Sequence, residues 1–286
     1  MPAPPPPRFV RTQNVSAFRT LAAVAWDPPF DPTIYGSAEI DADKLQLYLA
    51  DVRARTGQKV TMTHAVARAF AAVLAANPAL NCTVRRGRIW QRSQVDVFCQ
   101  VAVPPSEKGK LQGADLSGAL IKSADTLTTA AIAGRLAEIA ERIRNRDDPL
   151  LKATKRNLEV LPAWVTRPLM RLLGWLSHDW GMDLRWAGIP VDPFGSIMIT
   201  SLGMFGIRHA YAPLFPQAKG LGVVLVGGVY DGVVARDGVA TVRPLLPLSN
   251  AMDHRVIDGM QASVLAREVT KLLEDPALLD AGLAAG

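Results

Sequence analysis

The sequence has little of what marks a secreted or membrane-spanning chain. It contains only two cysteines, Cys82 and Cys99, each in an apolar context, so we expect no disulfide framework and a reducing compartment. No run of about 18 or more apolar residues occurs, and the N-terminal MPAPPPPRFV lacks the apolar core of a signal peptide. These absences predict a cytoplasmic protein.

Charge runs and metal-ligand patterns are also scarce. The net charge is +6, but the basic residues are scattered, with neither zinc-finger spacing nor a basic stripe interleaved with aromatics. His64, His178 and His209 lie at no metal-ligand spacing with Cys, Asp or Glu, and we interpret them as structural or surface residues. Nucleic-acid binding and a metal site are therefore not expected. The basic balance favours acidic partners, such as phosphorylated cofactors or anionic membrane surfaces.

Hydrophobic periodicity indicates helices that alternate irregularly with strands, which predicts an α+β fold with a mixed sheet. Residues 1–15 are interpreted as a proline-rich disordered leader and residues 16–280 as one domain. We expect helices at 16–25, 42–55, 62–76, 126–146 and 259–274, and strands at 35–41, 81–85, 88–91, 95–103, 195–201, 221–229 and 239–249.

Residues 150–190 differ from the rest of the chain. Four of the six tryptophans lie there, and LEVLPAWVTRPLMRLLGWL combines aromatic and aliphatic side chains with two prolines, Arg167 and Arg171. The segment is predicted to be a helical insert. Three roles stay open: a flap over the core or a subunit contact, a surface for lipid or a long acyl chain, and a docking site for a partner protein.

The segment AMDHRVIDGMQASVLAREVTKLLEDP begins at residue 251 and combines a turn with an amphipathic helix. His254 lies between a strand and that helix, and histidine is the side chain best suited to accept a proton near neutral pH. Asp258 directly precedes the helix and suits an N-cap, while Gly259 would ease the turn. The residues alone leave a catalytic and a purely structural interpretation open.

This segment resembles the active-site signature of the E2 acyltransferase catalytic domain of 2-oxoacid dehydrogenase complexes, a domain that shares its fold with chloramphenicol acetyltransferase. AEIDADKL, NPALN, VDVFCQVAV and ITSLGMFGIRHAYAPLFPQA are similar to further segments of the family. The resemblance covers about residues 16–150 and 195–276. It implies a two-layer sandwich of a mixed sheet flanked by helices, interrupted by the Trp-rich insert.

The resemblance also implies an activity, which is CoA-dependent acyl transfer with His254 as the general base. Thr200 in ITSLGMFG takes the place of the family's oxyanion donor, with Ser201 as the alternative if the register shifts by one. Asp258 would pair with an arginine of the N-terminal helix, for which Arg19 is the candidate. The resemblance further implies a homotrimer, with each active site in a channel between neighbouring subunits.

The chain departs from the family in features that bear on its partners. We recognise no lipoyl domain and no peripheral-subunit-binding domain, so a separate lipoyl- or acyl-carrier protein would supply the acyl group, or coenzyme A would carry it. PPSEKGKLQGADLSGAL matches the family's acyl-pocket strands poorly. The alternative is a non-catalytic, E2-like trimeric scaffold, with peripheral membrane contact through residues 158–176.

Overall fold

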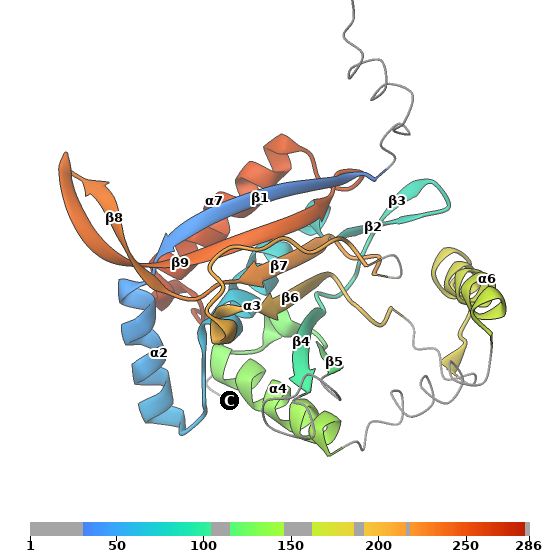
Figure 1. Ribbon diagram of the computed structural model, residues 1–286, viewed down its shortest axis with the longest axis horizontal. Helices are drawn as coiled ribbons and strands as arrows, with labels where there is room; N and C mark the ends of the chain where they lie inside the picture. The colour runs from blue at the N-terminus through green and yellow to red at the C-terminus, as the bar shows by residue number, and fades with distance from the viewer. Residues whose placement is uncertain (1–30, 104–114, 146–161, 186–191, 216–217, 284–286) are drawn as a thin grey trace, which may run out of the picture. The chain divides into compact units, whose positions relative to one another are not determined.

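The computed structural model describes residues 31–103, 115–145, 162–185, 192–215 and 218–283. Its main feature is a seven-stranded mixed sheet in the order β1-β9-β7-β6-β4-β5, with β8 paired to β9 (Figure 1). Strand β6 is parallel to both β4 and β7, and the other pairs are antiparallel. The strands are β1 Thr33–Asp41, β4 Val97–Val103, β5 Asp115–Ile121, β6 Ile197–Ser201, β7 Gly222–Val226, β8 Tyr230–Arg236 and β9 Val239–Asp253.

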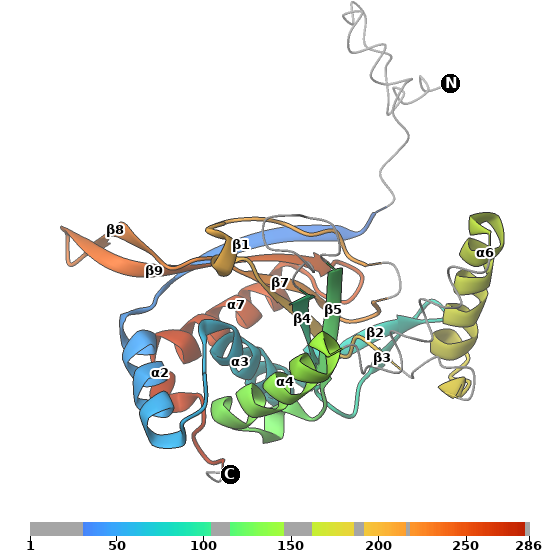
Figure 2. The same ribbon diagram turned by 60° about the horizontal axis from the view of Figure 1, so that its bottom comes forward.

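Helices lie against one face of this sheet (Figure 2). Their apolar sides and the inner side chains of the strands form the main core, which includes Leu45, Ile199, Leu246 and Leu265. The helices are α2 Asp43–Thr56, α3 Met62–Ala76, α4 Thr129–Arg144 and α7 Gly259–Glu274. The predicted fold class, a two-layer α+β sandwich with a mixed sheet flanked by helices, is confirmed.

A hairpin and a further helix lie outside the two layers, although Cys82 and Val84 of the hairpin still contact the main core. Strands β2 Cys82–Arg85 and β3 Arg88–Gln91 form a separate two-stranded sheet. Helix α6 Ala163–Gly174 lies within the Trp-rich segment and continues into a π-helical turn, η3 Trp175–Asp179. Among the described residues, no helix combines the length and the apolar character that a membrane span requires.

Strands β5 and β8 were not predicted, and β9 extends four residues beyond its predicted end. Strand β5 contains Gly118, and the Phe98 ring fills the space where a side chain at that position would lie. Strand β8 pairs only with β9, which continues to Asp253 because it pairs with β7 and β1 as well. The predicted leader 1–15 and helix 16–25 lie outside the described residues.

Candidate active site

His254 lies in the short turn that joins β9 to α7. The backbone N–H groups of Val256 and Ile257 close this turn by donating to the Asp253 carbonyl, at 3.0 and 3.2 Å. The imidazole is exposed, and its Nδ1 lies 2.8 Å from the Ile257 carbonyl oxygen. Because a carbonyl can only accept, Nδ1 carries the proton in this contact. In the neutral ring the basic lone pair is therefore on Nε2, the nitrogen that points away from the turn's own hydrogen bond.

The residues on either side of His254 form an ion pair. Arg255 donates to the Asp253 carboxylate from its backbone N, its Nε and its Nη2, at 3.0, 2.9 and 2.6 Å. Burial raises the pKa of Asp253, but the bonds from Arg255 outweigh burial and lower it below the usual 3.8. Sequence reasoning gave Arg255 no role. The structure shows that it fixes the backbone on both sides of the histidine.

Asp258 is the N-cap of α7, as the structural interpretation predicted. Its carboxylate accepts the Gln261 N–H at 2.9 Å, and the Gln261 side chain accepts the Asp258 N–H at 3.0 Å, which completes a capping box. The predicted partner Arg19 lies outside the described residues. Gly259 does not ease the turn as expected: an added Cβ would meet nothing within 4 Å, and its backbone is not left-handed.

Thr200 and Ser201 end strand β6 and point to opposite faces of the sheet, because successive strand residues alternate. Thr200 is 8% exposed and lies on the face away from the helices, together with Met198 and Leu225. In the part of the chain that the structure describes, the Thr200 hydroxyl has no hydrogen-bond partner. Its proton is therefore available to an incoming acceptor.

Glycines position the segment that follows Thr200. An added Cβ on Gly203 would lie 2.9 Å from the Gly227 carbonyl oxygen, and one on Gly227 only 2.0 Å from the Arg208 carbonyl oxygen. Gly206 has a φ of 72°, in the left-handed region. The Gly228 N–H donates to the Ile207 carbonyl at 3.0 Å. These backbone contacts give a physical reason for both glycines of ITSLGMFG and fix the segment beside Thr200.

Thr200 and His254 do not meet within one chain. Thr200 is paired with Leu225, which is paired with Ser249, five residues before His254. At about 3.3 Å per residue and about 4.8 Å between strands, the two backbones are on the order of 15–20 Å apart. An oxyanion donor acts within about 3 Å of the reacting oxygen. A single chain therefore presents two halves of the predicted site.

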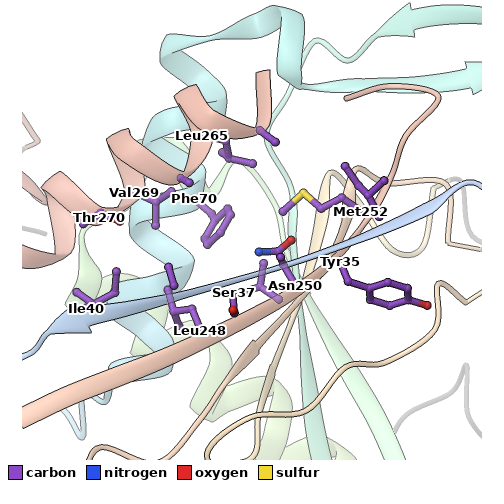
Figure 3. Close-up of a pocket in the computed structure, with 16 residues that line it drawn as sticks. Tyr35, Ser37, Ile40, Phe70, Leu248, Asn250, Met252, Leu265, Val269 and Thr270 are labelled. Carbon is purple, nitrogen blue, oxygen red and sulfur yellow. The ribbon is translucent and has the colours of Figure 1, made fainter. Parts of the chain in front are cut away.

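A cavity of about 170 Å³ lies between β1, β9 and α7 (Figure 3). Apolar side chains such as Phe70 and Leu265 line it, and the Asn250 amide points into it. Asn250 is opposite Gly36, where an added Cβ would lie 3.1 Å from its Oδ1. His254 lines neither this cavity nor the hollow at Arg85, Arg86, Arg88 and Trp90. The channel expected at the histidine is thus not formed by either of these spaces.

The other histidines are structural or surface residues, and the cysteines are buried, as expected; His209 is exposed. His64 is buried, and its Nδ1 accepts the Thr61 N–H at 2.9 Å; burial and the nearby Arg53 lower its pKa to about 4. His178 contacts the Val84 carbonyl, and both cysteines are buried and free. Within the described ranges, no group of three or more His, Cys, Asp or Glu side chains could bind a metal.

Solved acyltransferase cores have the same fold. A probable dihydrolipoamide acetyltransferase from Listeria monocytogenes aligns over 96% of this chain and 99% of its own, at 17% identity and a TM-score of 0.61. The dihydrolipoamide acetyltransferase of Azotobacter vinelandii aligns over 98% and 99%, at 19% identity and a TM-score of 0.62. That structure was solved to investigate a serine, a histidine and an asparagine in its catalytic mechanism. The fold is thus that of a dihydrolipoamide acetyltransferase core.

The sequence profile of the 2-oxoacid dehydrogenases acyltransferase (catalytic domain) family matches residues 30–149 and 194–280. Since these ranges make up most of the chain, the protein belongs to this family. It is similar to the dihydrolipoyllysine-residue acetyltransferase component of the acetoin cleaving system of Bacillus subtilis, with 27% identity over 79% of this chain. The match spans 44% of that relative's length, so the chain corresponds to less than half of it.

Proposed function

We propose that the protein is a CoA-dependent acyltransferase that moves an acyl group between coenzyme A and a dihydrolipoyl or other thiol. The main support for this proposal is the His254 turn. The chain belongs to the acyltransferase family, and the hydrogen bond of Nδ1 to the Ile257 carbonyl leaves Nε2 of His254 as the base. The relatives' names give the substrate class, since they include acetyltransferases, a succinyltransferase and branched-chain lipoamide acyltransferases. The non-catalytic scaffold is not favoured by these comparisons.

The proposed reaction uses the two halves of the site in turn. His254 Nε2 accepts the proton of the attacking thiol, and the thiolate adds to the carbonyl carbon of the partner's thioester. The Thr200 hydroxyl, or Ser201 in the shifted register, donates to the oxyanion of the tetrahedral intermediate. When the original C–S bond breaks, the departing thiolate takes the proton back from the imidazolium. No redox step or metal is required by this sequence.

We propose that the site is completed between subunits of a homotrimer, so that His254 of one subunit meets Thr200 of the next. Three observations support this. The two residues are far apart within a chain, His254 is exposed, and the segment beside Thr200 presents large apolar side chains to solvent. The exposed side chains are Met204, Phe205, Ile207, Tyr211 and Phe215, and Tyr35 packs edge-on against Tyr211 at 5.6 Å. One similar solved structure is the cubic core of a pyruvate dehydrogenase multienzyme complex.

The remaining proposals concern the surroundings of the site. Asp258, already the cap of α7, would also pair with Arg19 and so brace the turn against the N-terminal segment. A separate lipoyl- or acyl-carrier protein would deliver the acyl group in trans, unless acyl-CoA is the donor. We place the protein in the cytoplasm and expect no metal and no nucleic acid to take part.

The test is acyl exchange between acetyl-CoA and free dihydrolipoamide, followed by the appearance of the CoA thiol. His254→Ala removes a positioned base and is expected to lower kcat by about 10²- to 10⁴-fold. Arg267→Ala, an exposed position on the same helix, serves as the matched control and keeps the wild-type rate. Wild-type turnover in His254→Ala, with the fold intact by circular dichroism, would overturn the proposal. A series of acyl-CoA chain lengths then identifies the acyl group.

A further inference from the structure

The solvent-facing side of helix α6 is aromatic and apolar. Trp164, Leu172 and Trp175 recur at helical spacing, so they lie on one side of the helix together with Arg171. Trp164 is 79% exposed, and Trp175 packs edge-on against Trp180 at 5.6 Å. A helix face that meets only water normally has charged and polar residues. This face therefore has the composition of a binding surface. The segment exposes Trp164, Met170, Leu172, Trp175, Trp180 and Met182.

The π-helical turn fixes this segment to the β2–β3 hairpin. His178 Nε2 lies 3.0 Å from the Val84 carbonyl oxygen, and the Asp179 carboxylate accepts the Arg86 N–H at 2.8 Å. The Arg86 guanidinium lies 5.1 Å from the centre of the Trp180 ring, which adds a cation–π contact. The exposed tryptophans and the hairpin thus form one connected surface.

The hairpin makes that surface basic. Arg85, Arg86 and Arg88 line a hollow together with Trp90, and Arg85 lies 5.4 Å from the centre of the Trp90 ring. Every residue of β3 is exposed. Within the described ranges, none of these three arginines, nor Arg171 on α6, forms an ion pair with a carboxylate. Arg86, Arg88 and Arg171 are also exposed, so their positive charges are available to an anionic partner, whereas Arg85 is half-buried.

We propose that α6, η3 and the β2–β3 hairpin form a surface that binds an anionic lipid bilayer and brings the protein to a membrane surface. Tryptophan prefers the headgroup region, aliphatic and Met side chains enter the acyl boundary, and arginine attracts and binds lipid phosphates. A short helix with such side chains lies in the plane of the interface. This inference does not depend on catalysis.

The charges argue against a second copy of the chain as the occupant. A two-fold contact would bring the same surface of both subunits together, and the unpaired arginines of the hairpin would then face one another. Like charges brought close together and away from water repel. An anionic bilayer suits both the charge and the apolar character of the surface, because it offers phosphates to the arginines and an apolar layer to the tryptophans.

The experiment is co-sedimentation of the full chain with vesicles. We expect binding to vesicles that contain phosphatidylglycerol, weak binding to pure phosphatidylcholine, and a loss of binding as salt screens the charges. The double variant Arg88→Gln/Arg171→Gln removes two arginines that are worth about 1 kcal/mol each at an anionic surface. It should bind about 30-fold more weakly, since 1.4 kcal/mol corresponds to a factor of ten.

Matched controls separate the surface from net charge and general hydrophobicity. Arg135→Gln/Arg142→Gln removes two exposed positive charges from α4 and should bind like wild type. Trp164→Ser/Leu172→Ser should weaken binding, whereas Leu47→Ser, at a site that is 68% exposed on α2, should not. All these variants should keep the wild-type rate of acyl exchange, so failure of this proposal is distinct from failure of the catalytic one.

Several outcomes would overturn the proposal. Equal binding to both kinds of vesicle, or wild-type binding by Arg88→Gln/Arg171→Gln, would show that the basic surface does not recognise anionic lipid. If Trp164→Ser/Leu172→Ser changes the oligomeric state in light scattering and leaves vesicle binding intact, the segment is a subunit contact. If the protein sediments with none of the vesicles, the surface does not bind lipid.

Discussion

The distance between His254 and Thr200 within one chain predicts that two inactive variants restore activity when their subunits mix. His254→Ala keeps the oxyanion donor, and Thr200→Val keeps the base and the shape of the side chain that it replaces. Alone, the first should lose about 10²- to 10⁴-fold in kcat, and the second about 10²- to 10³-fold. A mixed oligomer contains some interfaces at which an intact histidine meets an intact threonine.

The size of the recovery follows from the geometry. In a closed ring, each site takes its histidine from one subunit and its threonine from the neighbour. When the two variants mix at random in equal amounts, about a quarter of the sites hold both intact residues, since each is present in half of the subunits. The mixture should therefore reach about a quarter of the wild-type rate, far above either variant alone.

The assay co-expresses the two variants with different affinity tags, purifies through both tags, and measures acyl exchange in the mixed oligomers. Because this selection removes oligomers of a single variant, the intact share rises from about a quarter of all sites to about one site in three of each mixed trimer. A second mixture, of wild type with the double variant His254→Ala/Thr200→Val, separates the two geometries. In mixed trimers, sites shared between subunits leave about one sixth of them intact, whereas sites within one chain leave half. Mixed oligomers with no more activity than the single variants would refute a site that is shared in this way.

Two further predictions concern the stability of the fold. Because burial lowers the pKa of His64 to about 4 from 6.5, its neutral ring stabilises the fold fully above pH 6.5 and loses this contribution as the pH falls through 4. Wild type should lose about 3 kcal/mol of unfolding free energy over that interval in urea titrations, and His64→Gln, which keeps the capping acceptor, should not. Asp280 pairs with the buried Arg68 at 3.4 Å, so Asp280→Asn should cost about 3–5 kcal/mol. The exposed Asp275→Asn should change stability by less than about 0.5 kcal/mol.

The elements that the sequence predicted well are those with a strong local signal. Helix α7 was predicted with its observed bounds, because six apolar residues mark one face and Asp258 caps the first turn. Strand β5 has no such signal. Asp115, Ser117 and Gly118 are poor strand formers, and the strand exists because β4 pairs with it and the Phe98 ring covers Gly118. That contact depends on tertiary structure and cannot be read from the segment.

The same distinction applies to the candidate site. The motif identified His254, but its tautomer depends on a bond to a carbonyl three residues ahead, which only the folded turn brings within 2.8 Å. The distance to Thr200 depends on the register of β6, β7 and β9, which long-range pairing determines. Arg255 was missed for another reason. Its partner Asp253 is only two residues away, and the sequence does not show that the backbone turns there and brings the two side chains together.

Each half of the proposed site is held by contacts within its own segment. This bears on how the site could be kept in relatives that share little sequence. The His254 turn is closed by its own hydrogen bonds and by the cap of α7, and the Thr200 segment is fixed by close backbone approaches at Gly203 and Gly227. Neither half needs the other in order to adopt its shape within a chain. Assembly then has only to bring two preformed surfaces together, so little ordering opposes it. If the proposed site forms between subunits, two short arrangements and one contact between subunits are enough to preserve the chemistry while the rest of the sequence changes.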